Sequence, residues 1–185
     1  MMNRTKLLAG LLIALVIASW IATAYFYLRL PSTIPTHFPP RSLERDFGSK
    51  ITLFIFPGLL TVVAAATLLS YRFRRRIYFF GKRRLLTLPE EAQEPVFERV
   101  YQVVLVIGIF IVLVMSYFEV SMALYALGVI WQFKTWPMFA AAGVMALYIV
   151  FNFYLVNRMV RYAEAWIEAR RGEDSGGQSL PPGFR

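Results

Sequence analysis

The chain has 185 residues, of which 58% are hydrophobic and 17% charged, and its mean hydropathy is +0.54. A soluble domain needs a more polar surface than this composition can supply, so we expect the chain to lie in a lipid bilayer. The absence of cysteine excludes disulfides, iron–sulfur clusters and cysteine-based zinc sites, and a single histidine argues against a haem or copper centre, so no cofactor is predicted.

Four apolar windows are long enough to cross the hydrocarbon core, which takes about 20 helical residues. They cover residues 7–28, 51–71, 100–122 and 138–156. We therefore expect an all-α integral membrane protein built as a four-transmembrane-helix bundle. The first window has a rival interpretation as a secretory signal, because Ala22-Thr23-Ala24 resembles a cleavage site. Its length and its aromatic end favour a transmembrane helix.

The basic residues predict the orientation of the bundle. Three quarters of the 20 Lys and Arg residues fall near the two termini and in the connector 72–99, and the rest in the loops 29–50 and 123–137. Cytoplasmic loops carry the excess of Lys and Arg, so both termini should be cytoplasmic and the loop 29–50 should face outward from the cell's inner (cytoplasmic) membrane. The basic run 72–84 is then expected to contact lipid headgroups, and a nucleic-acid partner is not expected.

Two further helical segments are predicted on the cytoplasmic side. Thr87-Leu88-Pro89-Glu90 has the pattern of a capping box with proline in the first turn, so a helix should begin there and kink or restart at Pro95. After the fourth window, apolar residues recur at helical spacing up to Arg171, which predicts a cytoplasmic amphipathic C-terminal helix. Residues 1–171 thus form one predicted membrane domain, and 172–185 a flexible cytoplasmic tail rich in Gly, Ser and Pro.

Residues within the windows predict how the helices pack. Small residues at Gly58 and 64–66, and at 140–143, are expected to form the bundle interior, because they let backbones approach closely. Pro57 is expected to kink the second helix, since it removes a backbone hydrogen bond. Asn152 is expected to form an interhelical hydrogen bond near the cytoplasmic end.

The outer loop reads LPSTIPTHFPPRSLERDFGSK from Leu30 to Lys50. Its prolines enforce extended backbone in the first half, so this Pro-rich loop is predicted to be stiff. Ile34, Phe38 and Phe47 are apolar residues among polar ones, which predicts that the loop folds back on the bundle.

These residues resemble a bacterial membrane-protein family, the domain of unknown function 1648, which also forms the N-terminal module of SdpI-type immunity proteins. The resemblance is carried by Leu30-Pro31, by Ile34-Pro35-Thr36-His37-Phe38, by Gly48-Ser49-Lys50 and by an apolar span that contains Pro57. It covers about the first third of the chain. It implies a membrane protein related to those that protect a cell against a secreted toxic peptide.

Two features depart from the family pattern. Ser42 and Arg45 stand where the family usually has a glycine and an aspartate, and Asp46 follows one position later. The chain also has no clear copy of the Gly-x-Arg-Thr-Pro-Trp stretch of the longer SdpI-type members. It therefore resembles a short, stand-alone four-span member, and the repressor-binding role of the longer proteins is not transferred.

The candidate site is a polar cluster at the outer mouth of the bundle. Its residues are Pro35, His37, Phe38, Asp46, Gly48, Lys50 and Glu119. His37 is the single side chain whose ordinary pKa places a charge change between pH 5 and 8. The cluster is expected either to receive an extracellular ligand or to lock the loop onto the bundle. A simpler alternative is that Lys50 reaches the headgroups and Glu119 sits at the interface.

The function predicted from these residues is non-enzymatic. One histidine and no cysteine leave no pair of nucleophile and base, and a metal on His37, Asp46 and Glu119 would have one nitrogen ligand, so no catalytic or metal site is predicted. The leading hypothesis is recognition of an extracytoplasmic peptide or other ligand. The alternative is an accessory or assembly subunit of a larger membrane complex. The expected partners are the lipid bilayer and either a secreted peptide or another membrane protein.

Overall fold

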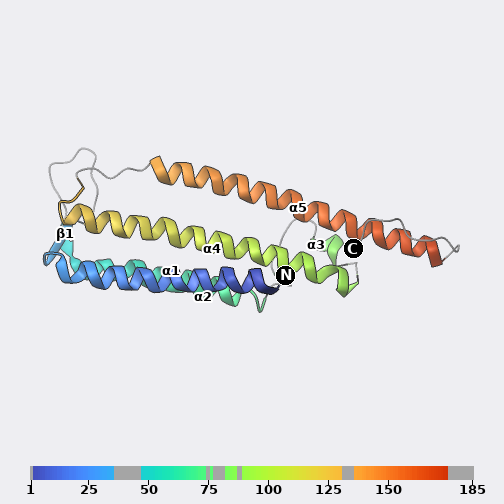
Figure 1. The fold of residues 1–185 in the computed structure, drawn as a ribbon, viewed down its shortest axis with the longest axis horizontal. Coiled ribbons are helices and arrows are strands. Elements are labelled where there is room, and N and C mark those ends of the chain that lie inside the picture. Colours follow the sequence, from blue (N-terminus) through green and yellow to red (C-terminus); the bar gives the residue numbers. More distant parts are fainter. Residues whose placement is uncertain are drawn as a thin grey trace.

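The computed structural model describes residues 2–35, 47–73, 76, 82–86, 89–130 and 136–174. Four long helices dominate these parts of the chain and lie lengthwise beside one another (Figure 1). The elements in chain order are α1 (Met2–Arg29), β1 (Thr33–Pro35), β2 (Phe47–Ser49), a 3-10 helix η1 (Lys50–Phe54), α2 (Ile55–Leu69), α3 (Lys82–Leu85), α4 (Glu90–Ala126) and α5 (Trp136–Asp174).

The described helices confirm the all-α, four-span prediction. Four stretches are long and apolar enough to cross a membrane, so the chain is a multi-pass membrane protein. They cover Arg4–Arg29, Lys50–Leu69, Gln93–Ala126 and Trp136–Ala169. The third and fourth are longer than predicted, because α4 and α5 each join a span and a neighbouring segment outside the predicted span into one helix.

Helices α1, α2 and α4 pack against one another around a shared core. Helix α4 runs parallel to α1 and antiparallel to α2, so hydrophobic faces from all three meet along the bundle. The fully buried core residues are Leu12, Leu60, Leu105 and Val112. At one end, which we call the hairpin end, the two short strands lie beside the last turns of α1 and α4 (Figure 1).

Helix α5 is attached less fully than the others. Its buried residues Val156 and Val160 pack with Val96, Phe97 and Val100 at the start of α4. The contact lies toward the end away from the hairpin, which we call the N-terminal end because α1 begins there (Figure 1). Only 11% of the apolar stretch of this span is buried inside the protein, against 28% for the span in α4. The remaining apolar side chains of α5, such as Phe139, Val144 and Leu147, are exposed.

Two prolines act differently from the sequence prediction. Of the predicted kink or restart at Pro95, the restart is excluded, because helix α4 is continuous from Glu90 past Pro95. Pro95 lies early in the helix, where it removes a single backbone hydrogen bond. Pro57 lies in the first turn of α2, directly after η1, where an N–H would have no intrahelical acceptor. The backbone at Phe54 and Ile55 is helical, so η1 runs directly into α2 and Pro57 lies just after the change from 3-10 helix to α-helix.

The small residues of α5 do not form the bundle interior, contrary to the prediction. Ala140, Ala142 and Gly143 are exposed, and a Cβ added to Gly143 would meet nothing within 4 Å. The close helix approach lies instead between α2 and α4. A Cβ built on Gly108 would lie 2.9 Å from both Cγ2 and Oγ1 of Thr67. The α2–α4 crossing therefore depends on a glycine that the sequence pattern did not single out.

Candidate functional site

The structure brings together part of the predicted cluster. His37, Phe38 and Asp46 lie outside the described residues. Pro35 and Gly48 lie in β1 and β2, and Lys50 begins η1. Glu119 lies on α4, about 10 Å before its end at Ala126 by the helical rise. Among the described residues Lys50 and Glu119 have separate partners, so they form two anchors rather than one shared ion pair.

The first anchor is a two-stranded antiparallel ladder at the base of the loop between α1 and α2. Thr33 pairs with Ser49, Ile34 with Gly48 and Pro35 with Phe47. Ile34 is fully buried, and it belongs to a cluster with Leu30, Leu53, Met122 and Ala123. This confirms that the loop folds back on the bundle at Ile34. The ladder closes the chain at 35 and 47, so segment 36–46 begins and ends on a base fixed to the helices.

Lys50 fastens the same base to the last turn of α1. Its Nζ donates to the carbonyl oxygens of Tyr27 at 3.1 Å and Leu30 at 3.4 Å, and it lies 4.3 Å from the centroid of the Tyr27 ring. The last carbonyls of a helix lack intrahelical donors, and a cation there also interacts favourably with the helix dipole. Lys50 therefore caps α1. The simpler interpretation had expected its side chain to extend to the headgroups instead.

The second anchor is Glu119, which is fully buried rather than exposed at the interface. Its Oε2 accepts a hydrogen bond of 2.6 Å from Ser19 Oγ, and its Oε1 accepts one from Thr23 Oγ1. Ser19 and Thr23 are four residues apart, so they share one face of α1. Both are themselves buried. A carboxyl group of α4 is thus held by two hydroxyl donors of α1 inside the bundle.

The arrangement around Glu119 is suited to holding helices together. The carboxyl accepts two hydrogen bonds in a medium that cannot supply water, so breaking them leaves a polar group unpaired. Its complete burial keeps it out of contact with a substrate from the aqueous phase. Among the described residues, no three His, Cys, Asp or Glu side chains are placed to hold a metal ion.

A second polar cluster at the N-terminal end was missed in the sequence. Gln102 Nε2 donates to Thr5 Oγ1 at 3.1 Å, and Thr5 Oγ1 donates to Glu98 Oε1 at 3.1 Å. Arg99 Nη2 donates to Asn152 Oδ1 at 2.9 Å, which confirms the interhelical bond predicted for Asn152. These contacts join α1, α4 and α5. The spacing of Arg99 and Gln102, one helical turn apart at the start of an apolar run, is the sequence signal that could have revealed it.

Comparisons with known proteins agree with the resemblance seen in the loop. Residues 14–61 match the family model described as Domain of unknown function (DUF1648). No curated protein and no solved structure matches the chain. The matched segment contains Ser19 and Thr23 on α1, the ladder and Lys50, whereas Glu119 lies outside it. The chain is therefore a multi-pass membrane protein in which residues 14–61 match the DUF1648 family model.

Proposed function

We propose that this protein is a non-enzymatic membrane protein that recognises an extracytoplasmic peptide through the segment between its two short strands. The observation that carries the proposal is the fixed base of that segment. The ladder closes it at 35 and 47, Ile34 buries the base in the bundle, and Lys50 ties it to the end of α1. A base fixed before binding reduces the entropy that a recognition loop loses when it meets its ligand.

The composition of segment 36–46 supports a peptide as the ligand. It contains His37, Phe38 and two prolines, together with charged residues of both signs. An aromatic ring and restricted backbone offer contact area at low entropic cost, and charged side chains can pair with a peptide's own charges. The family resemblance to SdpI-type immunity proteins points to the same ligand class.

The proposal requires the hairpin end to face outward, and this can be tested directly because the chain has no cysteine. We expect a Ser42→Cys variant in intact cells to react with a maleimide that cannot cross membranes. A Thr87→Cys variant should react only after the cells are opened, since the excess of Lys and Arg near residue 87 favours the cytoplasm. If the Thr87→Cys variant reacted in intact cells, the orientation would be the opposite of the one proposed. The proposed recognition surface would then not face the exterior.

The recognition itself is tested by survival. Cells that lack the protein should be more sensitive to at least one member of a panel of secreted membrane-active peptides, and the native chain should restore resistance. Replacing residues 36–46 by a Gly/Ser segment of equal length should abolish that resistance while the protein still accumulates in the membrane. A matched Gly/Ser replacement in the tail 175–185 should leave resistance intact. Equal resistance with and without the protein across the panel would contradict the proposal.

The alternative of an accessory subunit rests on α5. This helix contacts chiefly α4 and leaves large side chains such as Trp136, Phe139 and Leu147 exposed. Lipid can cover such a face as well as a protein can. Co-purification of one membrane protein in constant ratio with the native chain, lost when Phe139 and Leu147 are changed to Ala, would favour this alternative over peptide recognition.

A further inference from the structure

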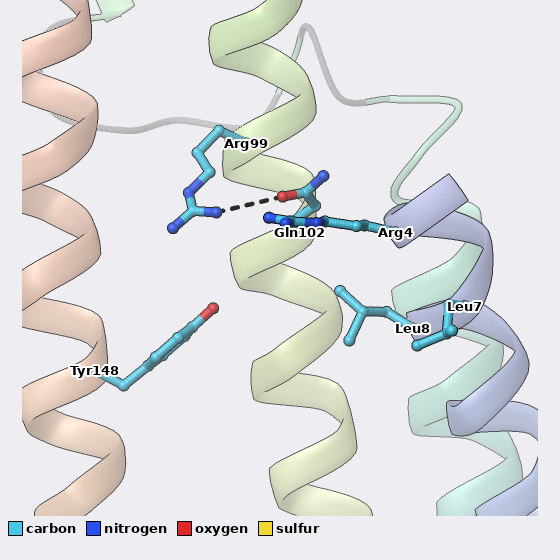
Figure 2. Close-up of a pocket in the computed structure, with 6 residues that line it drawn as sticks. All are labelled: Arg4, Leu7, Leu8, Arg99, Gln102 and Tyr148. Atoms are coloured by element: carbon cyan, nitrogen blue, oxygen red, sulfur yellow. Dashed lines mark hydrogen bonds between the residues drawn. The ribbon is translucent and has the colours of Figure 1, made fainter. Parts of the chain in front are cut away.

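A pocket of about 370 Å³ opens between α1, α4 and α5 at the N-terminal end (Figure 2). It is lined by Arg4, Leu7, Leu8, Arg99, Gln102 and Tyr148. In Figure 2 the side chain of Arg4 extends from α1 toward Gln102. The hydroxyl of Tyr148 points from α5 toward α4. Two guanidinium groups from different helices thus line one pocket, together with two leucines.

The two arginines retain hydrogen-bond capacity in this pocket. Arg99 donates from Nη1 to Gln102 Oε1 at 3.5 Å and from Nη2 to Asn152 Oδ1 at 2.9 Å, which uses two of its five N–H donors. Both acceptors are neutral, so they orient the guanidinium without cancelling its charge. Arg4 is exposed and makes no hydrogen bond within the described part of the chain. The carboxylate of Glu98 accepts from Thr5, and it forms no ion pair with either arginine.

The depth of the pocket indicates the phase from which a ligand comes. Arg4 is the first residue of one candidate span, and Arg99 follows the start of another at Gln93. Such positions lie near the boundary between hydrocarbon and headgroups, where an unpaired cation is attracted to anionic lipid. Leu11 on α1 and Val144 on α5 are exposed. Each lies one helical turn from a residue of the pocket, in the direction of the hairpin end. An acyl chain that left the pocket in this direction would meet apolar side chains.

We propose that this pocket binds the phosphate group of an anionic phospholipid, with Arg4 and Arg99 as its cationic ligands and Leu7 and Leu8 against the first part of an acyl chain. A guanidinium presents paired N–H donors that match two phosphate oxygens. Arg99 is held in position by Gln102 and Asn152, so it binds without a further loss of side-chain freedom. The bound lipid fills the opening between α1 and α5, and its phosphate joins Arg4 of α1 to Arg99 of α4.

The site is tested by the thermal stability of the detergent-purified chain with added lipid. Phosphatidylglycerol should raise the unfolding temperature more than phosphatidylcholine with the same acyl chains. Arg4→Gln should weaken the apparent affinity for phosphatidylglycerol about fivefold, the effect expected for one cation at the headgroup level. Arg72→Gln removes an exposed arginine on the connector at the same end and should leave the affinity unchanged. Arg99→Lys keeps the charge but loses the paired donors, so it should also weaken binding.

The same measurement distinguishes a phospholipid from a soluble phosphate as the ligand. Inorganic phosphate and glycerol phosphate at millimolar concentration should give little stabilisation, because they lack the acyl chain that Leu7 and Leu8 contact. A full shift with these soluble anions would retain the phosphate site but overturn the lipid assignment. Equal responses to the two lipids, or an equal loss in Arg72→Gln and Arg4→Gln, would overturn the site itself. None of these outcomes depends on peptide recognition at the hairpin end.

Discussion

Glu119→Ala should destabilise the protein by about 2 kcal/mol, since it removes two interhelical hydrogen bonds and leaves a cavity where a fully buried side chain was. Glu119→Gln keeps the volume and one acceptor oxygen, so its cost should be less than half as large. The measurement is unfolding in mixed micelles, in which the denaturant midpoint is followed by circular dichroism.

The neighbouring Ser121 supplies the control for this prediction. It is buried on the same helix, and the hydrogen bonds of Glu119 do not involve it. Ser121→Ala should change stability by about 1 kcal/mol or less, the net contribution of one buried hydroxyl. Combining Glu119→Ala with Thr23→Val should cost less than the sum of the two changes, because both remove the same bond. A Glu119→Ala protein as stable as Ser121→Ala would show that the carboxyl does not hold α1 to α4.

Gly108→Ala should destabilise the packing of α2 on α4 by about 1–3 kcal/mol, the usual range for an overpacked core. The new Cβ would lie 2.9 Å from two side-chain atoms of Thr67. Thr67 cannot easily turn away, because its Oγ1 donates to the carbonyl of Val63 at 2.8 Å and its β-branched side chain is stiff. The helices must therefore separate, and the same micelle unfolding measurement should report the loss.

Gly143→Ala is the matched control, since its added Cβ would meet nothing within 4 Å. An exposed glycine within a helix costs about 0.5–1 kcal/mol relative to alanine, so this change should be neutral or stabilising. Adding Thr67→Ala to Gly108→Ala should recover part of the loss, because it removes both of the closest atoms. If both glycine variants behaved alike, close approach at Gly108 would not limit the helix crossing.

The number and type of the spans could be predicted because hydrocarbon thickness sets a length that the sequence must satisfy. The packing of those spans could not be read in the same way. Small residues allow close approach but do not require it, so Ala140, Ala142 and Gly143 are exposed while Gly108 meets Thr67. Helix continuity through Pro95 could not be read from the sequence either, since a proline beyond the first turn removes a backbone hydrogen bond and usually breaks or kinks a helix.

The candidate site was predictable in its individual residues and not in its pairings. Lys50 and Glu119 were both singled out, but their partners are two backbone carbonyls at the end of α1 and two hydroxyl groups on that helix. Ser19 and Thr23 are common residues in membrane helices, and their spacing does not predict which carboxyl group they bind. Such a pairing depends on the relative rotation of α1 and α4, which hydropathy does not encode.

The weak attachment of α5 has a consequence for how the chain assembles during synthesis. All residues that bind Glu119, close the ladder and cap α1 precede residue 127, so these contacts can form before α5 leaves the ribosome. Insertion of the last helix then adds chiefly the contacts with the start of α4. The first three spans can thus mature as a unit onto which the final helix docks.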